Sequence, residues 1–404
     1  MSVDLRTRQD GPRSSVDADE FFGVELPSLL EAAEYTLGPG VRWLAPRPLT
    51  IEVDGSPCTL ASDDGRVQVI PRPLDGAAHV LISAEQLDGL VHDQETFMGM
   101  WSSGRLEQPV GSLGTALHWW LVLRAALDDT PIHTPGAIDF RDEDGGPLDL
   151  ARSFTTDDDP AAMRHFLEQA GFLHIAGVYD SHEMAAVSDD MDRAAPTYSD
   201  GDGRSWWATT SDGERRVVRM QSFDRHSETT TAILDDDRYL RIGEITADGH
   251  VAGRLSESRI EALFKPIGVV AGISDVPWHK DCSLGRHSYE CCRLTVGISV
   301  TGADETSGQL KVRAGSHRAL VWPALEQPGC DLPVVDLPTQ TGDVTVHLSC
   351  TLHMAQPPVA RERRVMYTGF GLPELDAAAS AAARAHLREV REAAPLTVSQ
   401  TPAV

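Results

Sequence analysis

The chain has 404 residues, of which 41% are hydrophobic and 24% are charged, and its formal net charge is −26. This length predicts two domains, and the strong negative charge argues against a nucleic-acid partner, because phosphate binding requires a basic surface. No apolar run approaches the roughly 20 residues that cross a bilayer, the first residues lack the apolar core of a signal peptide, and the six Cys show no paired spacing. We therefore expect a cytoplasmic protein with reduced thiols and no membrane contact.

The first part of the chain mixes helical and strand patterns. Residues 1–24 are polar and predict a disordered lead-in to a domain at 25–128. In chain order this domain is expected to contain a helix over 26–35, strands at 49–53, 67–70 and 79–82, a helix that starts near 84 and ends at 91, and a helix over 112–127. Asp63-Asp64-Gly65 is typical of a hairpin turn. No cluster of His, Cys or carboxylate in this region has ligand spacing.

Three stretches of this region are informative together: AHVLISAEQL at 78–87, FMGMWSSGRL at 97–106 and GSLGTAL at 111–117. In this order they resemble sterol-carrier proteins. The resemblance implies an α/β sandwich in which helices cover a five-stranded sheet above an apolar tunnel. The alternative is an unrelated α+β accessory domain.

Residues 129–159 are rich in Asp, Gly, Pro and Thr and predict a linker, followed by a second domain at 160–394 and a tail at 395–404. The expected elements are a helix over 160–170, a strand at 171–175, a helix through Met184 and Met191, a polar loop at 196–216, and a final helix at 375–393. Between this loop and the final helix there are short strand patterns at 217–220, 263–270, 294–300, 309–313, 343–347 and 364–370. Many short strands separated by turns indicate a β-sandwich or barrel.

The most informative motif is Pro-Trp-His-Lys-Asp-Cys at 277–282. Residues i and i+2 of a strand share a face, so His279 and Asp281 would project side by side. With one further His they would form the two-His-one-carboxylate triad that leaves coordination positions open on non-heme Fe(II). Downstream, a Gly-Asp turn and a strand lead to His353, with His347 as the rival third ligand.

The second domain carries a series of short motifs: RHFLEQAGFL at 164–173, FKP at 264–266, PWHKD at 277–281, LTVGI at 294–298, SGQL at 307–310, AGSH at 314–317, GD at 342–343, TLH at 351–353 and RR at 363–364. In content and order these motifs resemble the phytanoyl-CoA dioxygenase family of Fe(II)/2-oxoglutarate oxygenases. The resemblance implies a double-stranded β-helix (jelly roll) with flanking helices, and hence an α+β chain overall. It also implies that His279, Asp281 and His353 bind Fe(II), with 2-oxoglutarate and O2 as co-substrates.

The same resemblance implies that an Arg binds the distal carboxylate of 2-oxoglutarate. Arg363 is the first candidate and Arg364 the alternative, because neighbours on a strand face opposite ways and only one can point inward. Lys265, Gln221 and Thr295 are further candidates for co-substrate or substrate contacts, although core or surface roles fit each equally well. His317, in a Gly-Ser-His turn, is expected to be structural.

Asp281 bears on the reaction, because related halogenases have a small residue at this position to admit a halide. The carboxylate favours a hydroxylase, and the expected substrate is a small molecule of bacterial secondary metabolism, apolar or carrier-bound. Only three of the 35 basic residues are Lys, an Arg bias that suggests a GC-rich bacterial genome. The competing hypothesis is a catalytically silent lipid- or metabolite-binding protein. Substrate contacts are expected from loops at 196–216, 224–250 and 283–290; the substrate and the oligomeric state are left open.

Overall fold

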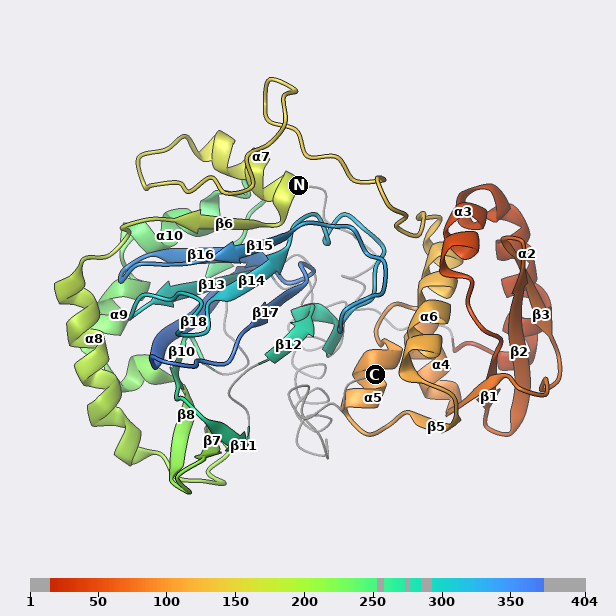
Figure 1. Cartoon of the computed structure of the whole chain (residues 1–404), viewed down its shortest axis with the longest axis horizontal. Coiled ribbons are helices and arrows are strands. Elements are labelled where there is room, and N and C mark those ends of the chain that lie inside the picture. The colour runs from red at the N-terminus through yellow and green to blue at the C-terminus, as the bar shows by residue number, and fades with distance from the viewer. Residues whose placement is uncertain (1–14, 253–257, 273–275, 285–292, 374–404) are drawn as a thin grey trace.

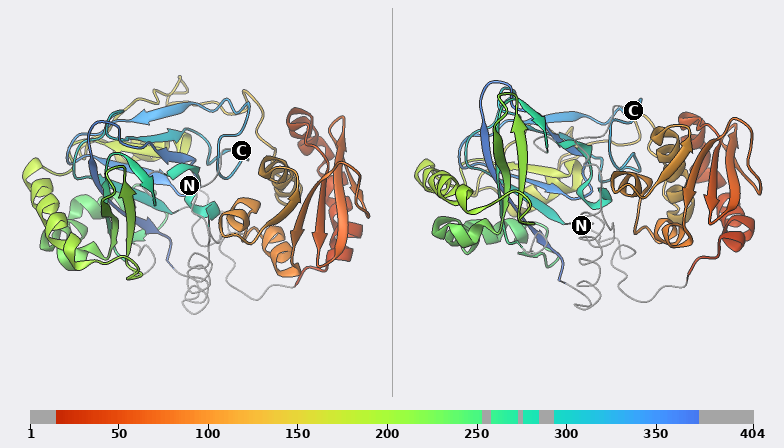
Figure 2. Two further views of the ribbon diagram at one scale, coloured as in Figure 1. Left: turned by 60° about the horizontal axis from the view of Figure 1, so that its bottom comes forward. Right: turned by 90° about the horizontal axis from the view of Figure 1, so that it is seen from below.

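The computed structural model describes residues 15–252, 258–272, 276–284 and 293–373. The described residues form two units, each with its own hydrophobic core, which lie side by side (Figures 1 and 2). The N-terminal unit comprises residues 15–128, and the C-terminal unit comprises the described residues from 160 onwards. No helix in the described ranges is both long and apolar enough to cross a bilayer.

The N-terminal unit is a five-stranded sheet covered by helices, with strand order β3-β2-β1-β4-β5 and a parallel pair β1–β4. Its elements are α1 (Ala18–Glu20), η2 (Phe21–Glu25), α2 (Leu26–Ala32), α3 (Glu34–Leu44), β1 (Leu49–Val53), β2 (Ser56–Asp63), β3 (Arg66–Ile70), β4 (Ala78–Ile82), α4 (Ala84–Val91), α5 (Phe97–Ser102), β5 (Glu107–Val110) and α6 (Leu113–Asp128).

Local sequence explains several of these boundaries. Asp64 and Gly65 both have positive φ and close the β2–β3 hairpin. Ser83 begins α4 through a reciprocal capping box with Gln86. The long helix α6 is buried on nearly all sides, so it serves as the centre of this core rather than as a surface helix.

The C-terminal unit contains the remaining elements. They are α7 (Pro160–Ala170), β6 (Phe172–Ile175), α8 (Ser181–Ala194), η3 (Ala195–Thr197), β7 (Ser205–Thr210), β8 (Arg215–Gln221), η4 (Phe223–His226), α9 (Glu228–Leu234), α10 (Asp237–Glu244), β9 (Val251–Ala252), β10 (Glu261–Lys265), β11 (Val269–Ala271), β12 (Val276–His279), η5 (Asp281–Leu284), β13 (Leu294–Ser299), β14 (Leu310–Arg313), β15 (Val334–Leu337), β16 (Val344–Leu348), β17 (His353–Ala355) and β18 (Arg363–Gly371).

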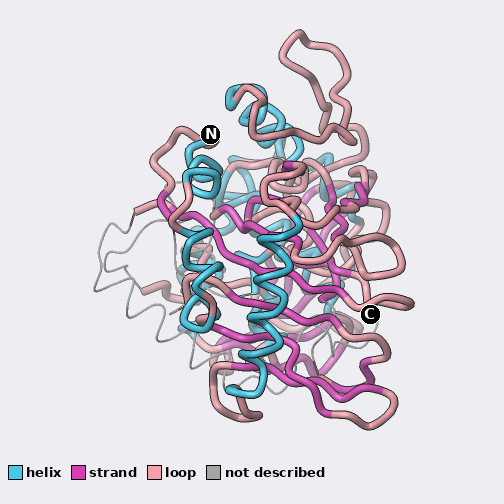
Figure 3. Tube along the Cα trace, turned by 90° about the vertical axis from the view of Figure 1, so that its left-hand side faces the viewer, coloured by secondary structure: helices cyan, strands magenta, loops and turns pink. Residues whose placement is uncertain are grey.

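Two antiparallel sheets form the centre of this unit. The larger has the order β11-β7-β8-β10-β18-β13-β16-β6, with β9 paired to β18, and the smaller has the order β12-β17-β14-β15. Helices α8, α9 and α10 lie along one side of the larger sheet, where Figure 3 shows helices in front of the strands. This pair of sheets with helical cover has the jelly-roll-like character that the sequence predicts.

Two predicted loops are wrong. Residues 205–210 form β7 within the expected loop 196–216, because Ser-Trp-Trp-Ala-Thr-Thr is β-prone and pairs with β8 across a turn at Gly213. The expected loop 224–250 contains η4, α9 and α10, and the side chains of Ser227 and Asp236 cap the two α-helices.

The lead-in also ends earlier than predicted. Helical structure begins at Ala18, and Phe21 and Phe22 are buried in the core of the N-terminal unit. The structure therefore includes the last part of the expected lead-in 1–24. The predicted helix at 375–393 and the tail at 395–404 lie outside the described residues, as does most of the expected loop 283–290.

A segment of the C-terminal unit packs into the other core. Trp322 is buried among residues of the N-terminal unit, and its ring lies 5.1 Å from that of His118. A Cβ on Gly114 would approach this ring to 3.1 Å, so the absence of a side chain there allows the ring to fit closely. In addition, α5 contacts η5, so the N-terminal unit touches the turn that carries Asp281.

Candidate metal centre

Strand pairing brings two histidines together at the edge of the smaller sheet. His279 ends β12, His353 begins β17, and the two residues are register partners across the antiparallel pair. Cross-strand partners have close Cβ atoms, and here the imidazole centroids are 4.2 Å apart. Pairing thus joins residues that are 74 positions apart in the sequence.

Asp281 completes a group of three ligand-type side chains. It begins η5 two residues after His279, and its Oδ1 lies 3.4 Å from His279 Nε2 and 3.6 Å from His353 Nε2. One ligand atom from each of His279, Asp281 and His353 lies within 4.8 Å of the others. Two imidazole nitrogens and one carboxylate oxygen are the donor set that non-heme Fe(II) accepts.

Backbone carbonyls fix the orientation of both imidazoles. His279 Nδ1 donates to Pro277 O at 2.7 Å, and His353 Nδ1 donates to Thr351 O at 3.0 Å. A carbonyl can only accept, so each Nδ1 carries the proton and each Nε2 presents its lone pair toward Asp281. A metal-binding histidine is commonly oriented in this way.

The electrostatics suit a cation. Burial lowers the pKa of His353 well below its ordinary range, and the neighbouring His347 and His279 lower it further, so the imidazole stays neutral. Burial alone would raise the pKa of Asp281, but the nearby histidines, His353 first among them, outweigh it and leave the pKa well below its usual value. A neutral imidazole and an ionised carboxylate are the forms that bind metal.

The second oxygen of Asp281 faces the larger sheet. Thr295 Oγ1 donates to Asp281 Oδ2 at 2.9 Å, and His347 Nε2 lies 3.6 Å from the same oxygen. Thr295 on β13 and His347 on β16 are register partners. The structure thus places Thr295, a predicted contact residue, and His347, the rival third ligand, beside Oδ2 of Asp281, the oxygen that faces away from His279 and His353.

The register of β18 separates the two arginines. Thr295 pairs with Gly369, and residues 363, 365, 367 and 369 share a strand face, so Arg363 lies on the same face of the sheet as Thr295. Arg363 is buried, donates to Gly308 O and to Tyr367 OH, and forms no ion pair with a carboxylate in the part of the chain described. Arg364 faces the other way and binds Asp192 and Ser188 of α8.

The other predicted residues lie at varying distances from this group. Lys265 is buried on β10 directly opposite Arg363, which places two cationic side chains side by side. Gln221, on β8, donates to Glu261 on β10 at 3.3 Å. His317 Nε2 donates to Glu168 O, and burial lowers its pKa to about 4. His317 thus joins a turn to α7, away from the three ligand-type groups.

Sequence reasoning missed two polar residues on this face. Tyr367 follows Arg363 by four positions, and i and i+4 of a strand share a face, so the spacing alone could have revealed it. Glu261 is buried on β10 opposite Tyr367 and is paired with Arg219. Its signal was weaker, because one acidic residue among 61 carries no pattern.

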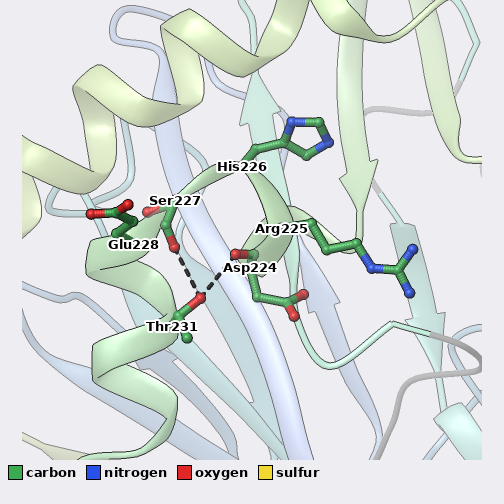
Figure 4. A pocket seen from close by; sticks show the side chains of 6 residues that line it. All are labelled: Asp224, Arg225, His226, Ser227, Glu228 and Thr231. Carbon is green, nitrogen blue, oxygen red and sulfur yellow. Dashed lines mark hydrogen bonds between the residues drawn. The ribbon is translucent and has the colours of Figure 1, made fainter.

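A shallow hollow lies elsewhere on the surface, at the N-terminal end of α9 (Figure 4). None of the residues of the candidate centre line it. The lining residues are Asp224, Arg225, His226, Ser227, Glu228 and Thr231.

Two facing antiparallel sheets with a His-x-Asp…His group at their edge define a non-heme iron oxygenase scaffold. A comparison with protein families gives the more specific assignment: residues 167–365 match phytanoyl-CoA dioxygenase (PhyH). The chain therefore carries a domain of the phytanoyl-CoA dioxygenase family, whose members are Fe/2-oxoglutarate-dependent oxygenases. The matched range includes all three ligand-type residues and Arg363, and the donor set fits the iron that this family uses.

Other comparisons were made with whole proteins. A search of curated proteins found no match. Among solved structures, AviO1 from Streptomyces viridochromogenes Tue57 is 20% identical, with 53% of this chain and 96% of AviO1 covered and a TM-score of 0.41. The epimerase SnoN in complex with Fe3+, alpha ketoglutarate and nogalamycin RO is 19% identical (55% and 90% covered, TM-score 0.42). EctD from S. alaskensis with 2-oxoglutarate and 5-hydroxyectoine is 15% identical (60% and 86% covered, TM-score 0.44).

The family match at residues 167–365 does not extend into the N-terminal unit. Its sterol-carrier-like character therefore stays a prediction.

Proposed function

We propose that the chain is an Fe(II)/2-oxoglutarate-dependent dioxygenase that hydroxylates an unactivated C–H bond of a small molecule and releases succinate and CO2. The observation that carries the proposal is the grouping of His279, Asp281 and His353 with both Nε2 atoms turned toward the carboxylate. In this proposal the three residues bind Fe(II). With 2-oxoglutarate and O2, the bound iron would supply the oxidising power.

The second element of the proposal is the anchor for 2-oxoglutarate. Arg363 is buried on the face that also presents Thr295, and it has no carboxylate partner in the described chain. A buried cation is costly unless an anion compensates it, and the guanidinium fork can donate two parallel hydrogen bonds to a carboxylate. Arg363 is thus the proposed partner of the distal carboxylate. Lys265, its cross-strand neighbour, adds positive charge at the same place.

The choice of hydroxylation over halogenation rests on Asp281. Its carboxylate is ionised and lies against both Nε2 atoms, so it occupies the position that a halide would need. Removing the carboxylate would open that position but would also remove the only anionic ligand of the group. The proposed product is therefore an alcohol rather than a chloride.

The proposed substrate is a small molecule of bacterial secondary metabolism, as expected from the sequence. The N-terminal unit contributes to its binding in this proposal, because α5 contacts η5 beside Asp281. The Phe and Met side chains of α5 are buried in the core of the N-terminal unit, so Trp101, which is partly exposed, is the large apolar side chain of this helix that can meet a substrate.

Anaerobic spectroscopy tests the reaction class. Adding Fe(II) and 2-oxoglutarate to the purified chain should give a weak charge-transfer absorption in the visible range. His279→Ala should abolish this band, while His317→Gln, which changes a histidine outside the ligand group, should keep it. Absence of the band in the wild-type chain, together with no succinate when candidate substrates are added in air, would refute the proposal.

The arginine pair offers a matched test of the co-substrate anchor. Arg363→Gln should raise the 2-oxoglutarate concentration for half-maximal band intensity by about 10-fold or more, since a charge-assisted bidentate contact is lost. Arg364→Gln should leave it within about twofold, because Arg364 contacts α8. A larger effect at Arg364 would show that the assignment of the inward face is wrong.

A further inference from the structure

The two oxygens of Asp281 have different surroundings. Oδ1 faces the Nε2 atoms of His279 and His353, at 3.4 and 3.6 Å. Oδ2 faces the larger sheet, where Thr295 Oγ1 donates to it at 2.9 Å and His347 Nε2 lies 3.6 Å away. One oxygen therefore points to the proposed metal position, and the other points to two polar side chains.

These two side chains come from adjacent strands at the same register position. Thr295 on β13 pairs with His347 on β16, so they project from one face of the sheet toward the carboxylate. His347 is 1% exposed, and neither of its ring nitrogens has a hydrogen-bond partner in the described residues. A buried imidazole without partners is costly, and Asp281 Oδ2 is an acceptor close to its Nε2.

We propose that His347 is a positioning residue that, together with Thr295, binds Oδ2 of Asp281 so that only Oδ1 is available to the metal. This inference rests on the proposed function and adds to it the device that sets the denticity of the carboxylate. With the Nε2–H tautomer, His347 donates to Oδ2 after a shift of a few tenths of an ångström. Thr295 already donates from the other strand.

The chemical reason lies in the number of open coordination positions. A carboxylate can bind a metal through one oxygen or through both. A bidentate Asp281 would use a position that 2-oxoglutarate or O2 needs. Two donors on Oδ2 make it a poorer ligand and also fix the carboxylate plane, as outer hydrogen bonds commonly do around metal sites.

Geometry distinguishes this role from that of a third histidine ligand. His347 lies outside the group of mutually close ligand atoms that His279, Asp281 and His353 form. His279 and His353 each donate from Nδ1 to a backbone carbonyl, whereas His347 has no such bond within the described chain. Its ring centroid lies 4.1 Å from that of His353, with the two rings tilted by 45°, and its Nε2 is directed to the side of Oδ2.

Titration of the full chain with Co(II), followed by calorimetry and visible absorption, tests the proposal without turnover. His347→Phe keeps the ring but removes the donor, and His347→Gln restores an N–H. Thr295→Val and Thr295→Ser form the matched pair on the other strand. Thr345→Val is the control, because Thr345 lies on the same strand face as His347 but outside the group around Asp281.

We expect His347→Phe to weaken Co(II) binding about 10-fold, because the carboxylate is no longer fixed, and to change the Co(II) absorption spectrum as Oδ2 of Asp281 replaces a water ligand. His347→Gln should stay within about threefold of wild type, and Thr345→Val should be unchanged. If His347→Phe fails to fold by circular dichroism, the Thr295 pair decides: Val should weaken binding and Ser should restore it.

Three results would overturn the proposal. His347→Phe could bind Co(II) like wild type, His347→Gln could lose as much affinity as His347→Phe, or His347→Phe could abolish binding as completely as His279→Ala. The third result would make His347 a ligand. If the wild-type chain binds no Co(II), the proposed function fails as well; normal wild-type binding with insensitive His347 variants removes the positioning role alone.

Discussion

Trp322 connects the two units, and its removal should be among the most destabilising single changes in the chain. Its side chain is buried in the core of the N-terminal unit although it belongs to the C-terminal unit. Its Nε1 has no hydrogen-bond partner in the described chain, so truncation to Ala removes packing and leaves no polar partner behind. Burying an aromatic side chain removes roughly 150–250 Å² from water, which at about 25 cal/mol per Å² is about 4–6 kcal/mol.

Measured Trp→Ala changes in cores cost about 3–5 kcal/mol, so about 4 kcal/mol is the expected loss for Trp322→Ala. Urea unfolding followed by circular dichroism should show a midpoint lower by about 1 M or more, given a slope of about 3 kcal/mol per M. Trp206→Ala is the control, because that ring is only partly buried and contacts Arg219, and it should cost about 1 kcal/mol. A loss below about 1 kcal/mol for Trp322→Ala, or one equal to that of Trp206→Ala, would refute the reasoning.

The same substitution should affect the candidate metal centre. The backbone next to Trp322 is hydrogen-bonded to the segment that carries His279: Lys280 N donates to Pro323 O at 2.9 Å, and Leu325 N donates to Trp278 O at 2.7 Å. A Trp322→Ala chain that still folds at low urea should therefore bind Co(II) more weakly than wild type. Unchanged affinity would mean that these backbone bonds do not depend on the ring.

Two further predictions concern stability. Gly342 has φ +87°, and a Cβ there would lie 1.9 Å from Tyr179 O. Gly342→Ala should therefore lower the free energy of unfolding by more than about 2 kcal/mol. Gly177→Ala is the control, because Gly177 also has positive φ but a Cβ there would meet no atom, and it should cost about 1 kcal/mol in the same urea assay. His317 has a folded-state pKa of about 4, below its unfolded value, so its contribution to stability is complete above about pH 6.5 and is lost as pH falls toward 4. As the pH is lowered from 8 to 4, the free energy of unfolding measured with urea should fall less steeply for His317→Gln than for wild type. The two slopes should differ by at most about 1.4 kcal/mol per pH unit; equal slopes would show that His317 does not cause the effect.

The predictable parts of the structure are those that local sequence determines. Strands and capped helices such as α4 and α7 were anticipated, because alternation and cap residues act within a few positions. The strand β7 was missed, since Ser-Trp-Trp-Ala-Thr-Thr is flanked by Asp- and Gly-rich turns that dominate the composition of the window. Helices α9 and α10 were missed because each spans two turns or so, too short for a helical period to emerge.

The candidate centre divides in the same way. The spacing of two residues is enough to predict that His279 and Asp281 project side by side, whereas the choice of His353 over His347 as the third ligand depends on a family resemblance. The contact of Thr295 with Asp281 depends on the pairing of β13 with β16, and no local pattern encodes that pairing. Equally, nothing near Trp322 indicates that its ring packs beside His118, about half the chain away.

These long-range contacts place Asp281 between two supports. On one side, Thr295 and His347 of the larger sheet face its outer oxygen. On the other, α5 of the N-terminal unit contacts η5, and the segment after Trp322 is bonded to β12. A turn at the end of a short strand would otherwise have few packing partners, so the N-terminal unit provides packing contacts for η5 that the C-terminal unit does not provide. The candidate metal centre therefore has contacts from both units, and substitutions in α5 or α6 should alter metal affinity even though neither helix carries a proposed ligand.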